Sequence, residues 1–310
     1  MSYCRNNLVV TPNIINCGQE TIYTSVKNCF SHDLSIDEFY FLSNPNCFDY
    51  LPNRNMMGYD TLKGMIDALH KNVSENIIYC HVISNNIKKD ICMQLNQGNL
   101  IIANLKDYSS YNEIDGNFYP YHLFIVHGYN DEEEVMLIDL YPNSNSNDKI
   151  RYFNLEWDFF CEHCAEYYLI QKSDLIVQRK QNMKRVIQKE LDFIVDKDNG
   201  ALSRINSFFL NLEKETSCYE KVGSVLIMKG LIFLPILFHT QNLFHSVLSD
   251  TEYNAIDLLI KKWTLFSAKY IKETYKGSGD LYNYLNIETI IDENRSVLDE
   301  IVHNHYNILL

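Results

Sequence analysis

The stretch YHLFIVHGYNDEEEVMLIDLYP, residues 121–142, decides the fold of the first half of this chain. Two apolar runs flank a polar turn, which is the pattern of a β-hairpin. His122 stands at the start of the first expected strand and Asp139 near the end of the second. Antiparallel pairing brings those two strand ends side by side, so the hairpin predicts that an imidazole and a carboxylate lie close together.

Three more short runs rich in Ile, Val, Leu and Tyr lie between polar turns, at residues 76–83, 99–105 and 164–172. Their length and composition are those of buried strands. We expect the last of them to return to the sheet that contains the hairpin. Helical segments alternate with these strands up to about Leu169, so the pattern predicts an α+β fold.

The second half of the chain has a helical pattern. Residues 174–197 carry apolar side chains at helical intervals, namely Ile176, Met183, Ile187, Leu191 and Ile194. From there to Leu310 almost no period-two alternation occurs. The predicted domains are therefore 1–172 and 173–310, packed on each other. The expected helix breaks are residues 198–200, Gly223, Gly230, Pro235 and residues 276–279.

Composition limits the function classes. The chain has 310 residues, of which 46% are hydrophobic, and its 27 basic and 40 acidic residues give a net charge of −13. Phosphate binding needs basic surface, so nucleic acid is an unsuitable partner and an amine-bearing ligand a suitable one. No run has the length of a membrane span or a signal peptide, which predicts a cytoplasmic protein. The odd number of cysteines, nine, indicates reduced thiols.

The run NCGQETIYTSVKNC, residues 16–29, predicts a helix with Cys17 in its first turn. A helix amino terminus lowers the pKa of a thiol, because its free backbone N–H groups stabilise the thiolate. A nucleophilic cysteine needs a base, and the base needs an orienting partner. Cys17, His122 and Asp139 therefore form a candidate catalytic triad, in the chain order that papain-like enzymes use.

Other cysteines and histidines have ordinary structural interpretations. Four cysteines read as small buried hydrophobic residues: Cys29, Cys47, Cys80 and Cys92. The motif CEHC, residues 161–164, could suggest a redox or metal site, but no second ligand pair occurs at a suitable spacing, so we expect no metal. His122 could be a strand-end residue with a structural partner. His127, before Gly128 at the turn, is expected to be the more exposed histidine. Asp139 could instead cap the turn before Pro142.

These segments resemble the amino-terminal domain of the butirosin biosynthesis protein H family, a papain-like branch that is also similar to the peptidases that cut double-glycine leaders. The resemblance covers roughly residues 10–170 and lies in NCGQETIYTSVKN, LSIDEFYFLS, QLNQGNLIIANLKDY, HLFIVHGYND and LIDLYP. It implies a papain-like domain with an antiparallel sheet, a helical carboxy-terminal domain, and catalytic roles for Cys17, His122 and Asp139. Papain-like enzymes usually have a glutamine six residues before the cysteine, where this chain has Thr11. Asn13 or the backbone N–H of Cys17 could supply that oxyanion donor, and Gln19 is a poorer candidate.

The resemblance also implies a reaction. Such a triad captures an acyl group as a thioester and passes it to a second nucleophile. In the family the donor is an acyl group on the phosphopantetheine of an acyl or peptidyl carrier protein, and the acceptor is an amine of an aminoglycoside. A papain-like amide synthetase of the closthioamide type, with a diamine acceptor, fits the same residues. No other cofactor is expected, and no GxxxxGK[ST] phosphate-binding pattern occurs.

Two alternatives stay open: a cysteine peptidase of the double-glycine-leader type, and a papain-fold binding module without activity. The ligand-binding surfaces are also only expectations. The acidic residues that could hold the amine are Asp60, Asp107, Glu113 and Asp115; the basic residues that could dock a carrier protein are Arg179, Lys180, Lys184, Arg185 and Lys189. Aromatic residues that could form an acyl pocket are Tyr108, Tyr111, Phe118, Tyr119 and Tyr121. Solvated surface and ordinary core packing would explain the same residues.

Overall fold

The structure, a computed structural model, describes residues 4–5, 17–30, 34–43, 59–74, 76–81, 86–106, 121–130, 133–140, 150–172, 180–212, 214, 217–277 and 279–309. The chain divides into two compact units. The sheet unit comprises Met1–Leu34 and Gly58–Lys180, and the helical unit comprises Ser35–Met57 and Gln181–Leu310. This division differs from the predicted domains 1–172 and 173–310. The segment Ser35–Met57 lies in the first half of the sequence but groups with the helical unit.

The sheet unit contains an open antiparallel sheet in the strand order β2-β7-β3-β4-β5-β6, with β1 paired to β4. The strands are β1 Cys4–Arg5, β2 Ile77–His81, β3 Leu100–Lys106, β4 Tyr121–Tyr129, β5 Glu134–Asp139, β6 Arg151–Glu156 and β7 Cys164–Ile170. The predicted α+β class is confirmed, and so is the return of residues 164–170 to the same sheet, where β7 pairs with both β2 and β3.

Strands β4 and β5 form the predicted hairpin. Ile125 pairs with Ile138 and Val126 with Leu137, but Gly128 then pairs with Met136, so the register shifts between Val126 and Gly128. One extra residue, His127, therefore lies on β4 at a β-bulge. A bulge turns the extra side chain away from its expected face, and His127 is buried. The expectation that His127 is the exposed histidine is wrong for this reason.

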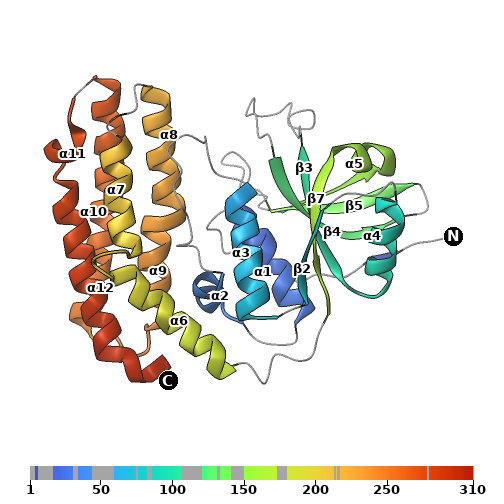
Figure 1. Cartoon of the computed structure of the whole chain (residues 1–310), viewed down its shortest axis with the longest axis horizontal. Coiled ribbons are helices and arrows are strands. Elements are labelled where there is room, and N and C mark those ends of the chain that lie inside the picture. Colours follow the sequence, from blue (N-terminus) through green and yellow to red (C-terminus); the bar gives the residue numbers. More distant parts are fainter. Residues whose placement is uncertain are drawn as a thin grey trace. The chain divides into compact units, whose positions relative to one another are not determined.

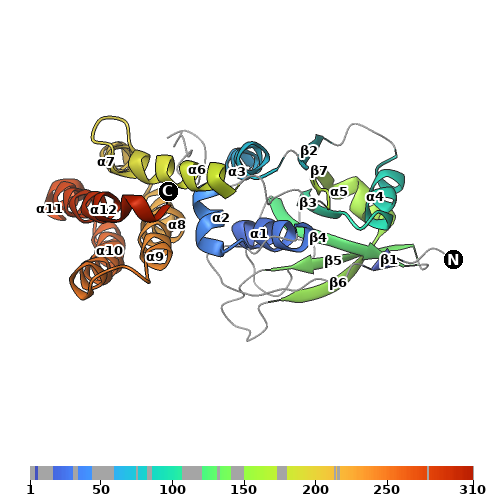
Figure 2. The ribbon, with the colours of Figure 1, turned by 90° about the horizontal axis from the view of Figure 1, so that it is seen from below.

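Four helices of the sheet unit surround this sheet: α1 Cys17–Cys29, α3 Tyr59–Asn72, α4 Ile87–Asn96 and α5 Trp157–His163 (Figure 2). Helices α4 and α5 pack on one face. Their residues Ile91, Leu95 and Phe160 join a buried cluster with Phe124 and Leu137 of the sheet. Burial of this apolar surface is the main stabilising contribution to the unit.

Helix α1 packs on β3, β4 and β7. Its Ile22, Tyr23 and Val26 are buried at the three- and four-residue spacing of one helix face. At its last residue, the Cys29 Sγ–H donates to the Ile170 carbonyl oxygen at 3.2 Å. Ile170 pairs with Leu100, the first residue of β3. The carboxy-terminal end of α1 therefore lies at the start of β3.

The helical unit contains α2 Ile36–Leu42, α6 Lys180–Val195, α7 Ala201–Leu212, α8 Cys218–Met228, the π-helical turn η4 Lys229–Phe233, α9 Leu234–Leu243, α10 Asp250–Tyr275, α11 Leu281–Tyr284 and α12 Ile287–Leu309. Helices α7, α8, α10 and α12 run side by side (Figure 1). Trp263 lies at their centre, with its ring stacked on Phe233 at 4.0 Å and its indole N–H donating to Asn294 at 3.0 Å. No helix within the described ranges is both long and apolar enough to cross a membrane.

The expected breaks were partly correct. Helices end before residues 198–200 and 276–279, as predicted. The break at Gly223 is wrong, because this residue lies inside α8. Near Gly230 and Pro235 the α-helix gives way to the π-helical turn η4, and α9 follows it directly. Packing outweighs the low helix propensity of Gly223. The π-helical turn accommodates Pro235, which lies in the first turn of α9, where its missing N–H costs little.

Helix α2 belongs to the helical unit for two reasons. Its Phe39, Tyr40, Phe41 and Leu42 are buried, and α2 packs on α9. Local sequence starts the helix at Ser35, whose side chain accepts from the Glu38 N–H in a capping box. Apolar burial then determines where the helix packs, which is a tertiary property that the sequence pattern does not specify.

Candidate functional site

Cys17 is the first residue of α1, as predicted. The first backbone N–H groups of a helix have no partner inside the helix, so they stabilise an anion placed there. Glu20 in the first turn and Lys27 in the last turn complement the helix dipole and help to define both helix ends. The side chain of Cys17 lies outside the described part of the structure. The helix start at Cys17 is therefore confirmed, and the lowered pKa of its thiol stays a prediction.

His122 and Asp139 lie at the same end of the hairpin. His122 is the second residue of β4 and pairs with Leu105 of β3. Asp139 is the last residue of β5. Continuing the register of Ile125 and Ile138 by one residue places Asp139 beside Phe124, two residues along β4 from His122. The backbone therefore brings the two predicted residues to one end of the sheet, while the His122 side chain lies outside the described part.

Asp139 is only 4% exposed, between the buried residues Ile138 and Leu140. A carboxylate in such a place is stable only with polar or charged partners, and Asp139 has at least one such interaction. Its backbone pairs with Arg151 of β6, whose guanidinium lies over the Phe153 ring, 5.4 Å from the ring centroid. The alternative role of Asp139, a cap of the turn before Pro142, depends on residues that lie outside the described part of the structure.

The oxyanion donor is not identified by the geometry. Asn13, like Thr11, lies outside the described residues. Gln19 is the third residue of α1, and its side chain is buried and already engaged in an interaction. An oxyanion donor must face the reacting carbonyl. The burial of Gln19 therefore disfavours this residue as the donor, and the sequence had already made it the poorer candidate.

A buried polar cluster that the sequence analysis missed lies on β3 and β7. Glu166 is completely buried, and its Oε1 accepts from Asn104 Nδ2 at 2.9 Å and from the Tyr168 hydroxyl at 3.0 Å. Among the described residues, its Oε2 has no hydrogen-bond partner. The sequence feature that could have indicated this cluster is Glu166, a single carboxylate inside the apolar run of residues 164–172. The partner of Glu166 is visible only in the sheet, where Asn104 pairs with it.

Three of the other described thiols, Cys29, Cys161 and Cys164, have a raised pKa. Burial raises the pKa of Cys29 to about 12, and burial likewise raises the pKa of Cys164 to about 12. Burial also raises the pKa of Cys161, with a further contribution from Asp158. A thiol that stays protonated at neutral pH is a poor nucleophile and a poor metal ligand.

The CEHC motif spans a structural junction. Cys161 and His163 belong to the end of α5, and Cys164 begins β7. The His163 Nδ1–H donates to the Phe159 carbonyl oxygen at 2.9 Å, and its ring stacks on Phe159. Across the described ranges, no group of three or more His, Cys, Asp or Glu side chains is arranged to hold a metal ion.

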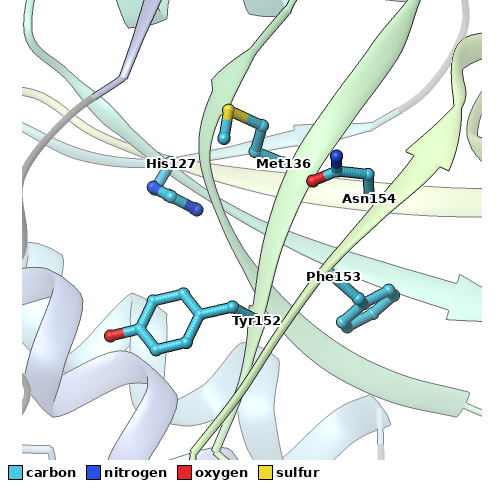
Figure 3. Close-up of a pocket in the computed structure, with 5 residues that line it drawn as sticks. All are labelled: His127, Met136, Tyr152, Phe153 and Asn154. Carbon is cyan, nitrogen blue, oxygen red and sulfur yellow. The ribbon is translucent and has the colours of Figure 1, made fainter.

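The bulge residue His127 lines a cavity of about 240 Å³ on β4, β5 and β6. The other lining residues are Met136, Tyr152, Phe153 and Asn154. Figure 3 shows Tyr152 and His127 on the same side of β6, with Phe153 pointing to the other side. The Tyr152 ring is 56% exposed and makes an edge contact with His127 at 6.1 Å. The sequence offered no signal for this cavity, because it depends on the bulge.

The predicted ligand surfaces fall largely outside the described residues. This holds for Asp107, Glu113, Asp115, Arg179 and the aromatic residues before Tyr121, and for the side chains of Asp60, Tyr121 and Lys180. On α6, the side chains of Lys184, Arg185 and Lys189 are exposed. Together they form a basic surface on the solvent side of that helix.

Neither a protein-family model nor a curated protein sequence matches this chain.

Proposed function

We propose that this protein is a cytoplasmic cysteine acyltransferase of natural-product biosynthesis, built on a papain-like fold, that forms an amide from a carrier-protein thioester and an amine. The observation that carries the proposal is a common end of the sheet: β4 begins there, with His122 as its second residue, and β5 ends there with Asp139. Helix α1, which begins with Cys17, packs on β4 and on its neighbour β3. Nucleophile, base and orienting carboxylate are the three components that such a reaction needs.

The dimensions of α1 support this arrangement. Its last residue, Cys29, lies at the start of β3. A helix of 13 residues is roughly 20 Å long, and the seven residues of β3 span roughly 20 Å as well. A helix that packs along β3 and β4 from that point therefore begins near the end of β3. Since β3 and β4 are antiparallel, the end of β3 is the start of β4, where His122 lies.

The proposed chemistry has two steps. The Cys17 thiolate attacks the thioester carbonyl, and the carrier thiol leaves with the proton that His122 holds. The amine then attacks the acyl-cysteine, His122 takes a proton from it, and the Cys17 thiolate leaves. Asp139 keeps the His122 imidazole in the tautomer that can accept the proton. Exchange of one thioester for another is nearly isoenergetic, so the reaction needs no ATP.

The surface charges agree with the two substrates of this reaction. Lys184, Arg185 and Lys189 form an exposed basic surface on α6, which suits an acidic carrier protein. The net charge of −13 favours a cationic amine over an anionic acceptor.

Intact-protein mass spectrometry tests the proposal. The wild type is incubated with an acylated carrier protein, and amines are then added. We expect a mass increase equal to the acyl group, which disappears when an amine is present and yields the amide. Cys17→Ala should form no adduct, whereas Cys218→Ala, which changes a half-buried thiol of the helical unit, should behave as the wild type.

Each other outcome points to a different class. Discharge of the acyl group only to water would indicate a hydrolase, such as a leader peptidase. Absence of an adduct with every donor would contradict the proposal and favour a binding module.

A further inference from the structure

We infer that the cavity lined by His127, Met136 and Tyr152 is a binding site for a small organic ammonium ion. This site is separate from the candidate catalytic residues. Side chains of successive strand residues point to opposite faces of a sheet. Met136 and Ile138 therefore share the cavity face, whereas Asp139 lies on the opposite face.

The backbone creates room for a ligand at this place. Gly128 pairs with Met136, and as a glycine it places no side chain on the face that Met136 shares. The bulge at His127 turns the imidazole into the same region. Bulges that redirect a side chain are frequent beside binding sites. A cavity of about 240 Å³ exceeds the roughly 150 Å³ that accommodates one benzene molecule.

The lining of the cavity suits a cation. Tyr152 is an aromatic residue with 56% of its surface exposed, and an exposed aromatic face attracts ammonium groups. Met136 adds a polarisable thioether. Asn154 donates through Nδ2 to Glu134 Oε2 at 2.9 Å, which leaves its carbonyl oxygen to accept from an ammonium N–H.

Two carboxylates near the cavity also favour a cationic ligand. Glu134 and Glu156 are direct cross-strand partners, on the same face as Met136 and Asn154. Like charges at this position repel each other, and a cation beside them relieves the repulsion. Of the described basic side chains nearby, Arg151 lies over the opposite-face ring of Phe153, and Lys88 pairs with Glu133. The backbone of Arg5 pairs with Gly128, and the Arg5 side chain lies outside the described part of the structure.

Binding of butylammonium tests the inference, with 1-butanol as the neutral ligand of similar shape, measured by calorimetry on the full chain. We expect saturable binding of butylammonium and no comparable binding of 1-butanol. Tyr152→Ala should weaken the affinity about tenfold, and Glu134→Gln should weaken it several-fold at low salt. Met136→Trp, which fills the cavity, should abolish it while the circular dichroism spectrum stays unchanged.

Two matched controls isolate the site. Tyr275→Ala changes an equally exposed tyrosine of the helical unit, and Glu162→Gln changes an exposed carboxylate on α5. Both variants should bind butylammonium as the wild type does. Cys17→Ala should also keep the affinity, which separates this site from the proposed acyl transfer.

Three results would overturn the inference. They are no saturable binding of butylammonium by the wild type, equal binding of 1-butanol, and an affinity that Tyr152→Ala leaves unchanged. Preference for 1-butanol would identify the cavity as an apolar pocket for a neutral chain.

Discussion

Glu166 Oε1 accepts a hydrogen bond from Asn104 Nδ2 at 2.9 Å, across the pairing of β7 with β3, and both side chains are buried. Asn104→Leu removes this donor and leaves the carboxylate with only the Tyr168 hydroxyl. We expect the free energy of unfolding to fall by about 2 kcal/mol, because a buried polar group then loses one of its hydrogen bonds. Urea unfolding measures this loss.

The control for that substitution is Asn154→Leu on the edge strand β6, where the side chain is exposed. It should change the unfolding free energy by less than about 0.5 kcal/mol. Equal losses in the two variants would contradict the structural role assigned to the Asn104–Glu166 pair.

Alkylation should distinguish the thiols. Burial raises the pKa of Cys29 and of Cys164 to about 12, so at pH 7 both are protonated and shielded. Cys17, at the start of a helix, should react with iodoacetamide much faster. Peptide mapping by mass spectrometry after a short exposure checks this order. In denaturant all three should be labelled alike, and native labelling of Cys29 at the rate of Cys17 would refute the prediction.

The stability of the helical unit should depend on pH through Glu190. Burial raises the pKa of Glu190 from 4.5 to about 7, so between these values the folded state binds a proton that the unfolded state has lost. The stability that this bound proton contributes to the folded state is fully present below pH 4.5. It is lost as the pH rises through 7. Glu190→Gln should remove this loss, on the order of 2 kcal/mol.

Thermal unfolding of the wild type and the Gln variant across pH 4.5 to 8 measures the difference between them. The variant should gain stability relative to the wild type as the pH rises. A constant difference over this range would show that Glu190 titrates normally in the folded protein.

The His239–Asp37 pair should hold α2 on α9. His239 Nδ1 lies 2.7 Å from Asp37 Oδ1, and Asn242 Nδ2 donates to the same oxygen at 3.2 Å. Asp37→Asn should cost about 1 kcal/mol, because the amide oxygen of Asn can still accept the hydrogen bond but no longer carries the charge that strengthens it. Hydrogen exchange should show the loss as faster exchange in α2.

A double-mutant cycle of Asp37→Asn with His239→Gln gives the coupling energy between the two side chains. The surface pair Lys261 and Asp257, one helical turn apart on α10, provides the comparison. Its coupling should stay below about 0.5 kcal/mol. A coupling this small for His239 and Asp37 would mean that apolar burial alone holds α2.

Much of the architecture could be predicted because it depends on local patterns. The apolar runs around Leu123 and Leu137 and the start of α1 at Cys17 are readable from alternation and from helix-start signals. Strands β1 and β6 were missed. β1 has only two residues, and β6 is an edge strand whose exposed residues, among them Tyr152 and Asn154, do not form an apolar run.

The candidate site was predictable only in part. The meeting of His122 and Asp139 at one end of a hairpin follows from antiparallel pairing, which the turn between the two apolar runs specifies. The burial of His127 was mispredicted, because a one-residue bulge depends on how β4 fits β5 and not on either strand alone. The partner of Glu166 lies 62 residues away in the chain, beyond the reach of any local pattern.

The sequence by itself determined the α+β class, the hairpin that carries His122 and Asp139, and the helix that begins at Cys17, because periodicity and capping act over a few neighbouring residues. Only the tertiary structure decided that α2 joins the helical unit, that Asn104 meets Glu166, and that His127 lines a cavity. These features require residues far apart in the chain to exclude water together, and burial of that kind exists only once the whole unit has folded.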